Sequence, residues 1–296
     1  MTENTAFHVH IPQNMTVLLN LYNKAPRSLI MAGGTHLMNH TMKPDGEHHS
    51  ILAVGQLDEL KKISRTDRYI ELGSCVTINE MIDAQLGVAS PLLLDTMSHM
   101  GPYPIRNVST IGGNLCIPEK RMDLFPVLLL MDARMELRHV KRKRNGRASY
   151  KSRWIHINSF LDAEGRPDLA EGEILSRIRI PFYDGSFHFH RKVNIQDNDF
   201  FTINALASLD KGVLSDVRVA FTNGGLFILR SRDMEANLMG RRFPLTRKEL
   251  DEVMSGLSRY FSKPENPYEE YLMNSLFRQL LESLADPSDT GDFSLQ

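Results

Sequence analysis

The pattern of apolar and polar positions predicts short strands and helices that alternate through the first 181 residues. The segments 28–32, which is apolar after Ser28, and 51–54, which is apolar throughout, are typical of buried strands, whereas the alternation at 69–73 and 173–181 is typical of half-buried strands. Helices are expected where a start signal precedes apolar periodicity: at 15–22 after Asn14, from 78 after the capping box Thr77–Glu80, and at 92–100 after Pro91.

From residue 182 onward the pattern changes to strands followed by helices. Strands are expected at 187–192, 200–209 and 217–222, and helices at 230–239 and 268–284. Strands followed by helices favour a separate α+β domain. The polar stretch 286–296 is expected to fray.

Two glycine pairs carry the main chemical signal. One lies in Met31–Met38 after a predicted strand, and the other lies in Thr110–Asn114. Adjacent glycines let the backbone approach a ligand closely, and consecutive N–H groups then favour an anion. Neither loop matches the Walker A or the G-x-G-x-x-G pattern, so plain turns are the alternative. Two such loops in one chain suit a pyrophosphate held from two sides.

The segments Ala32–Leu37 and Ile105–Asn114 resemble the A-G-G-T/H-x-L and I-R-N-x-x-T-I-G-G-N motifs of one family. This is the FAD-binding subunit of the molybdopterin-containing hydroxylases, the xanthine dehydrogenase and carbon monoxide dehydrogenase group. The segments 191–193, 218–221 and 230–235 match further landmarks, so the resemblance covers nearly the whole chain.

The resemblance implies an α+β fold with a two-subdomain FAD-binding domain, of the PCMH or vanillyl-alcohol-oxidase-like type. A C-terminal α/β domain with an antiparallel sheet and helices follows. The expected boundaries are 1–181 (subdomains 1–60 and 61–181), 182–288, and a tail at 289–296. The expected FAD-contacting residues are Met31, Ala32, Gly33, Gly34, Thr35, His36, Leu37, Thr110, Ile111, Gly112, Gly113, Asn114, Asp123, Ile178 and Lys192.

Two of these residues have a second interpretation. Asp123 is placed to cap a helix as well as to accept hydrogen bonds from ligand hydroxyls. Lys192 is either an exposed strand lysine or a cation near the flavin. The chain also departs from the family at Glu119–Arg121, where the family has small residues. Charged side chains there are expected to alter the flavin's potential or to weaken FAD binding.

Composition and charge exclude several functional classes. The formal net charge is -1, which does not favour nucleic acid or an anionic membrane, and no apolar run approaches a membrane span. The basic run 141–144 precedes Asn145–Gly146, a strong hairpin signal, so it is expected on a solvated hairpin. With no signal peptide visible, a cytoplasmic location is the simplest expectation.

The chain has two cysteines and eleven histidines. Two thiols are too few for an iron–sulfur cluster, and no histidine spacing indicates a metal site. If FAD is bound, as the resemblance implies, the flavin supplies the redox chemistry and no side chain needs to act as an acid or base. The resemblance implies a molybdopterin-binding large subunit and a [2Fe–2S] small subunit as partners, with NAD or another molecule accepting electrons. The alternatives are a stand-alone FAD oxidoreductase and a subunit that has lost FAD.

Overall fold

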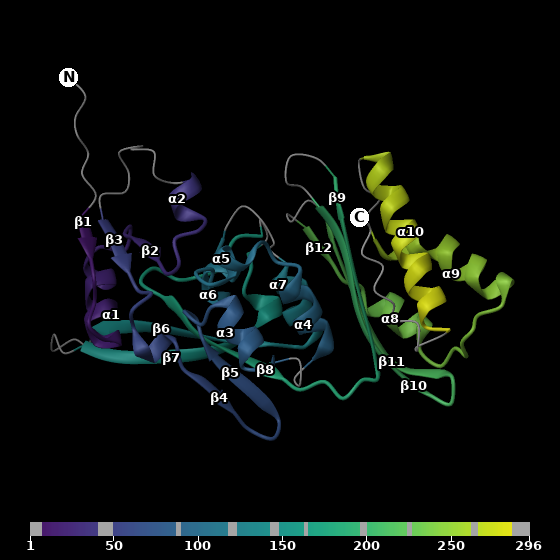
Figure 1. The fold of residues 1–296 in the computed structure, drawn as a ribbon, viewed down its shortest axis with the longest axis horizontal. Coiled ribbons are helices and arrows are strands. Elements are labelled where there is room, and N and C mark those ends of the chain that lie inside the picture. The colour runs from purple at the N-terminus through teal and green to yellow at the C-terminus, as the bar shows by residue number, and fades with distance from the viewer. Residues whose placement is uncertain are drawn as a thin grey trace.

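The computed structural model contains three β-sheets arranged in sequence order along an elongated molecule (Figure 1). Helices lie between and beside these sheets. The structure describes residues 8–40, 50–86, 90–117, 123–142, 148–162, 165–195, 200–223, 227–261 and 266–285. Several features that the sequence predicts lie outside these ranges: a turn at 44–46, the Glu119–Arg121 segment, the Asn145–Gly146 turn, a third glycine pair at 224–225 and the C-terminal tail.

The first sheet is parallel and small, with the order β1-β3-β2. Its strands are β1 (His8–His10), β2 (Leu29–Met31) and β3 (Ser50–Ala53), and they accompany α1 (Met15–Lys24) and α2 (Leu37–His40). The predicted cap of α1 is confirmed, because the Asn14 side chain accepts a hydrogen bond from the Val17 N–H at 2.9 Å. The prediction that 28–32 is a buried strand is wrong in its burial, since β2 is an edge strand and Ile30 is 38% exposed.

The second sheet is antiparallel, with the order β4-β5-β8-β6-β7. Its strands are β4 (Ile63–Arg65), β5 (Tyr69–Gly73), β6 (Arg134–Arg142), β7 (Ala148–His156) and β8 (Ile174–Pro181). Apolar side chains of this sheet form one core with those of the helices after β5. These helices are α3 (Ile78–Asp83), α4 (Pro91–Ser98), α6 (Ile111–Leu115) and α7 (Leu124–Leu130), whereas α5 (Tyr103–Arg106), between α4 and α6, has no buried side chain. The predicted capping box at Thr77–Glu80 is confirmed at the start of α3.

The third sheet is an antiparallel meander, β12-β11-β10-β9. Its strands are β9 (Phe187–Asn194), β10 (Phe200–Asp210), β11 (Val213–Asn223) and β12 (Phe227–Leu229). One face packs against α8 (Arg232–Leu238), α9 (Arg247–Tyr260) and α10 (Pro267–Ser283). The other face contributes Leu206 and Ala220 to the core that contains α4 and α7. The sheet therefore has helices on both faces.

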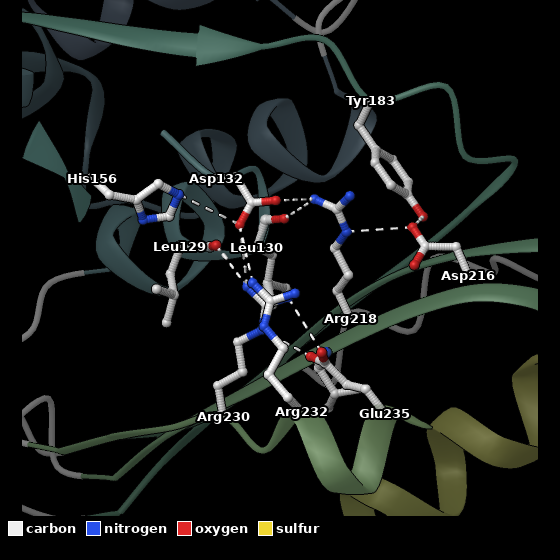
Figure 2. A network of polar contacts seen from close by, with 11 residues as sticks. Leu129, Leu130, Asp132, His156, Tyr183, Asp216, Arg218, Arg230, Arg232 and Glu235 are labelled. Atoms are coloured by element: carbon white, nitrogen blue, oxygen red, sulfur yellow. Dashed lines mark hydrogen bonds and ion pairs between the residues drawn. The ribbon is translucent and has the colours of Figure 1, made fainter. Parts of the chain in front are cut away.

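Arg218 on β11 and Arg230, which directly follows β12, bind the C-terminal end of α7 (Figure 2). Arg218 donates to the Leu130 carbonyl at 2.7 Å and to Asp132 at 3.0 Å, and Arg230 donates to the Leu129 carbonyl at 2.9 Å. The last carbonyls of a helix have no partner within the helix and carry the negative end of its dipole. The guanidinium groups donate hydrogen bonds to these carbonyls and place positive charge at the negative end of the dipole. They therefore fix the third sheet against α7.

Arg230 is held in turn by a buried carboxylate. Its Nε lies 2.8 Å from Glu235 Oε1, which also accepts a hydrogen bond from the Val219 N–H at 2.9 Å. The side chains of Arg230 and Glu235 are 8% and 7% exposed. Arg232 lies nearby but is 63% exposed, and its closest approach to Asp132 is 3.4 Å. Two arginines of one network thus differ sharply in burial.

We expect Arg230→Leu to lower the free energy of unfolding by about 3 kcal/mol, because it leaves a buried carboxylate without its charge partner. Arg232→Leu is the matched control and should change this free energy by less than about 0.5 kcal/mol. Urea unfolding followed by circular dichroism measures both values. Equal losses in the two variants would contradict the assigned role of the buried pair.

Candidate cofactor site

The two glycine loops, far apart in sequence, come together in the structure. A Cβ atom built on Gly33 would stand 1.6 Å from the carbonyl oxygen of Val108, just ahead of the second loop. Only glycine permits so close an approach of two backbones. Gly34 has a φ of +73°, which also favours glycine. Glycine is therefore required at position 33 by the close backbone contact and at position 34 by the backbone conformation.

The first loop has backbone N–H groups that are available to donate hydrogen bonds to a ligand. Within the described residues, the backbone N–H groups of Gly33 and Gly34 donate no hydrogen bond. The Gly34 carbonyl accepts from the Met38 N–H at 2.9 Å, which starts the turn of α2. The rest of the loop is half-buried: Met31, Ala32, Thr35, His36 and Leu37. Two adjacent N–H groups without partners are what a phosphate oxygen needs.

The second loop differs from the expectation that its N–H groups serve a ligand. They bind within the chain: Ile111 to the Val76 carbonyl, Gly112 to the Ser74 carbonyl, and Gly113 and Asn114 to Thr110. The segment is the start of α6, with Thr110 as its N-cap. A Cβ on Gly112 would stand 2.6 Å from Ser74, so this glycine is required for packing. Gly113 is exposed, and a Cβ there would have only Thr110 Oγ1 nearby, at 2.9 Å.

The Ile105–Asn107 motif, which precedes this loop, is held by hydrogen bonds to α3. Arg106 Nε donates to Asn79 Oδ1 at 3.2 Å, and Asn79 Nδ2 donates to Asn107 Oδ1 at 2.6 Å. Asn79 is 5% exposed and lies on α3. Sequence reasoning missed Asn79, although its place in the helix capped by Thr77 was a usable signal. The motif therefore positions the second loop through hydrogen bonds between side chains.

Asp123 and Lys192 meet across the two halves of the chain. Lys192 Nζ lies 2.8 Å from Asp123 Oδ1 and 4.1 Å from the centre of the Phe200 ring. Asp123 stands at the N-cap position of α7, but its side chain makes no capping hydrogen bond. The capping interpretation is therefore wrong for the side chain. The interpretation of Lys192 as an exposed strand lysine is also wrong, because its side chain is 24% exposed and ion-paired.

Ile178 occupies a different environment from the other candidates. It is 0% exposed in the core of the second sheet, where its partners in register are Leu72 and Met135. No side-chain surface is left to contact a ligand. Its role in this structure is packing.

Two buried oxygen atoms near these elements have no hydrogen-bond partner in the described structure. They are Asn114 Oδ1 on α6 and Thr222 Oγ1 on β11. In register, Thr222 is the neighbour of Thr202, which in turn is the neighbour of Lys192. Buried polar atoms are rarely left without a partner unless a ligand or water supplies one. Neither oxygen has surface that a cofactor could reach in this structure, and Thr222 is 0% exposed. The groups that fit a dinucleotide with phosphates and hydroxyls are therefore the Gly33 and Gly34 N–H groups and the Asp123–Lys192 pair.

The two cysteine thiols are unreactive. Burial raises the pKa of the Cys75 thiol to about 11 and that of the Cys116 thiol to about 12. Both sulfurs are therefore protonated at neutral pH and are poor metal ligands. Among the described residues, no three His, Cys, Asp or Glu side chains are grouped as metal ligands. Within the same ranges, no helix has the length and apolar character that crossing a bilayer requires.

Comparison with known proteins identifies the class. Residues 5–183 match the family described as the FAD binding domain in molybdopterin dehydrogenase, and the chain belongs to this family, whose cofactor is FAD. The resemblance noted from the glycine loops is thus confirmed. The family's members are components of oxidoreductases.

Relatives and solved structures agree with this class. The chain is 29% identical over 221 residues to the xanthine dehydrogenase FAD-binding subunit of Escherichia coli O157:H7, covering 72% of each chain. It is 22% identical over 258 residues to the glyceraldehyde dehydrogenase medium chain of Sulfolobus acidocaldarius, covering 84% of each. A chain of the Cu,Mo-CO dehydrogenase crystal structure shares the fold, with a TM-score of 0.78 and 18% identity, over 95% of this chain and 98% of that one. The predicted fold class is confirmed.

We expect Gly33→Ala to lower the free energy of unfolding by about 2 kcal/mol, because the added Cβ forces two backbones apart. FAD retention should fall with it, since the loops no longer meet. Gly256→Ala, in the middle of α9 with its nearest atom 4.0 Å away, is the control and should be neutral or stabilising by up to about 1 kcal/mol. Thermal unfolding and flavin absorbance measure the two effects. A stable, FAD-loaded Gly33→Ala protein would exclude the close contact.

Proposed function

We propose that the chain is the FAD-binding electron-transfer subunit of a molybdenum hydroxylase. It would take electrons from [2Fe–2S] clusters of a partner subunit and pass them to NAD or another acceptor. The observation that carries the proposal is the contact of the first loop with Val108, which presents the Gly33 and Gly34 N–H groups beside the second loop. The cytoplasmic location expected from the sequence stays a prediction.

Each residue of the site has a proposed task. The Gly33 and Gly34 N–H groups would bind a phosphate of FAD. Asp123 would accept from hydroxyls, while Lys192 keeps positive charge beside it. FAD supplies the electron-accepting ring when bound. The protein's contribution is position and electrostatic potential, with no side chain acting as acid or base.

The partners follow from what this chain has and from its relatives. It has two cysteines, which is fewer than the four thiolates that hold an iron–sulfur cluster. The relatives' names describe a FAD-binding subunit and a medium chain, which are parts of larger enzymes. We therefore propose a molybdopterin-binding large subunit and a [2Fe–2S] small subunit as partners. The substrate would bind to the large subunit.

The test of the cofactor site uses Gly113, which is exposed and where an added Cβ would meet the Thr110 side chain at 2.9 Å. Gly113→Val should weaken FAD binding at least about tenfold, a loss of about 1.4 kcal/mol, because its side chain projects where the cofactor would lie. Fluorescence titration with FAD measures the dissociation constant, and circular dichroism checks the fold. Gly256→Ala again serves as the control. An unchanged dissociation constant in a folded Gly113→Val protein would exclude contact at this position.

The test of the electron-transfer role is co-purification. An affinity-tagged chain, expressed with its natural partners, should retain an iron-containing subunit, and its flavin should be reduced when that subunit is reduced. A tagged chain that carries FAD, binds no iron-containing partner and oxidises a substrate alone would favour the stand-alone oxidoreductase. A chain that takes up no FAD would favour the subunit without a cofactor.

A further inference from the structure

A buried histidine lies where the third sheet meets the rest of the protein. His190 of β9 is 6% exposed, on a strand packed against α4. Its ring centre lies 5.9 Å from that of His99, which follows α4. Two residues further along β9, Lys192 makes the ion pair with Asp123. His190 is thus part of the contact that brings Lys192 to the candidate cofactor site.

The hydrogen bonds of His190 define its neutral form. Its Nδ1 lies 2.8 Å from Asn204 Oδ1, and Asn204 Nδ2 donates to Thr202 Oγ1 at 3.4 Å. With the amide in this orientation, the Asn204 oxygen accepts and His190 Nδ1 carries the proton. His190 Nε2 is buried and has no hydrogen-bond partner in the described structure. A second proton would therefore create a buried N–H group without an acceptor.

Polar and charged groups around the ring shift the pKa of His190 in both directions. Asp95 and His99 face it from α4 and the residue after it, Asp123 from the start of α7, and His188 and Lys192 share its strand. Burial lowers the pKa of His190, and the His99 ring lowers it further, whereas Asn204, Asp95 and Asp123 raise it. Burial dominates, so the net direction is downward. His99, whose ring lies beside that of His190, is 61% exposed.

We propose that His190 is an acid-sensitive contact between α4 and the third sheet. When Nε2 binds a proton, the charged ring moves out of its buried position, and β9 separates from α4. Lys192 then moves away from Asp123, and the candidate cofactor site loses one side. The sign follows from the lowered pKa. Since the unfolded chain binds a proton more readily than the folded one, stability is full above pH about 6.5 and falls as the pH decreases below it.

The experiment measures the melting temperature of the full chain, without added FAD, from pH 8 to pH 5. Wild type should lose about 3 °C more than His190→Asn over this range, because about 1 kcal/mol corresponds to a few degrees in a chain of this size. Asparagine keeps a donor for Asn204 but does not titrate. His10→Asn, at an exposed position of β1, is the control and should follow wild type.

A second measurement keeps the proposal testable if His190→Asn does not fold. The pKa of His190 in wild type, read from its imidazole proton resonance, should lie below 6.5. Equal pH profiles for wild type and His190→Asn, or a His190 pKa at or above 6.5, would overturn the proposal. Neither measurement uses FAD, so a failed flavin assignment and a failed histidine assignment are distinguishable.

Discussion

The position of the third sheet depends on the contact between its arginines and the end of α7. Arg218 and Arg230 bind the last carbonyls of a helix seven residues long, whose other end begins next to Asp123. Such a helix spans about 10 Å, so restraint at one end also restrains the other. Lys192 completes this arrangement from the same sheet. One short helix therefore connects the contacts of Arg218 and Arg230 with the candidate cofactor site.

The two glycine pairs show that the same sequence signal serves different physical needs. Gly33 permits a backbone contact, Gly34 adopts a positive φ, and Gly112 packs against Ser74. Gly113 is exposed, but an added Cβ would stand 2.9 Å from Thr110 Oγ1, which already accepts the Gly113 N–H. The first loop offers hydrogen-bond donors and the second offers shape. A cofactor held between them would be recognised by charge on one side and by fit on the other.

Local signals made much of the fold predictable from sequence. Asn14 and the Thr77–Glu80 box capped the helices as expected, because such caps depend on residues within one turn. The capping box Thr246–Glu249 starts α9, a helix that sequence reasoning missed although the same signal was present. The exposure of Ile30 was not predictable, since it depends on β2 lying at a sheet edge. The expected division into domains stays a prediction.

The candidate site was less accessible to sequence reasoning, because its contacts join distant segments. The pairing of Lys192 with Asp123 spans 69 positions, and the N–H groups of the second loop find partners near residues 74–76.

The place of the third sheet late in the sequence has a consequence for how the protein is synthesised. During synthesis the surface of α4 and α7 emerges before β9–β11 exist to cover it. Until then its apolar side chains remain accessible, so the nascent protein depends on prompt completion, or on a chaperone, to avoid aggregation.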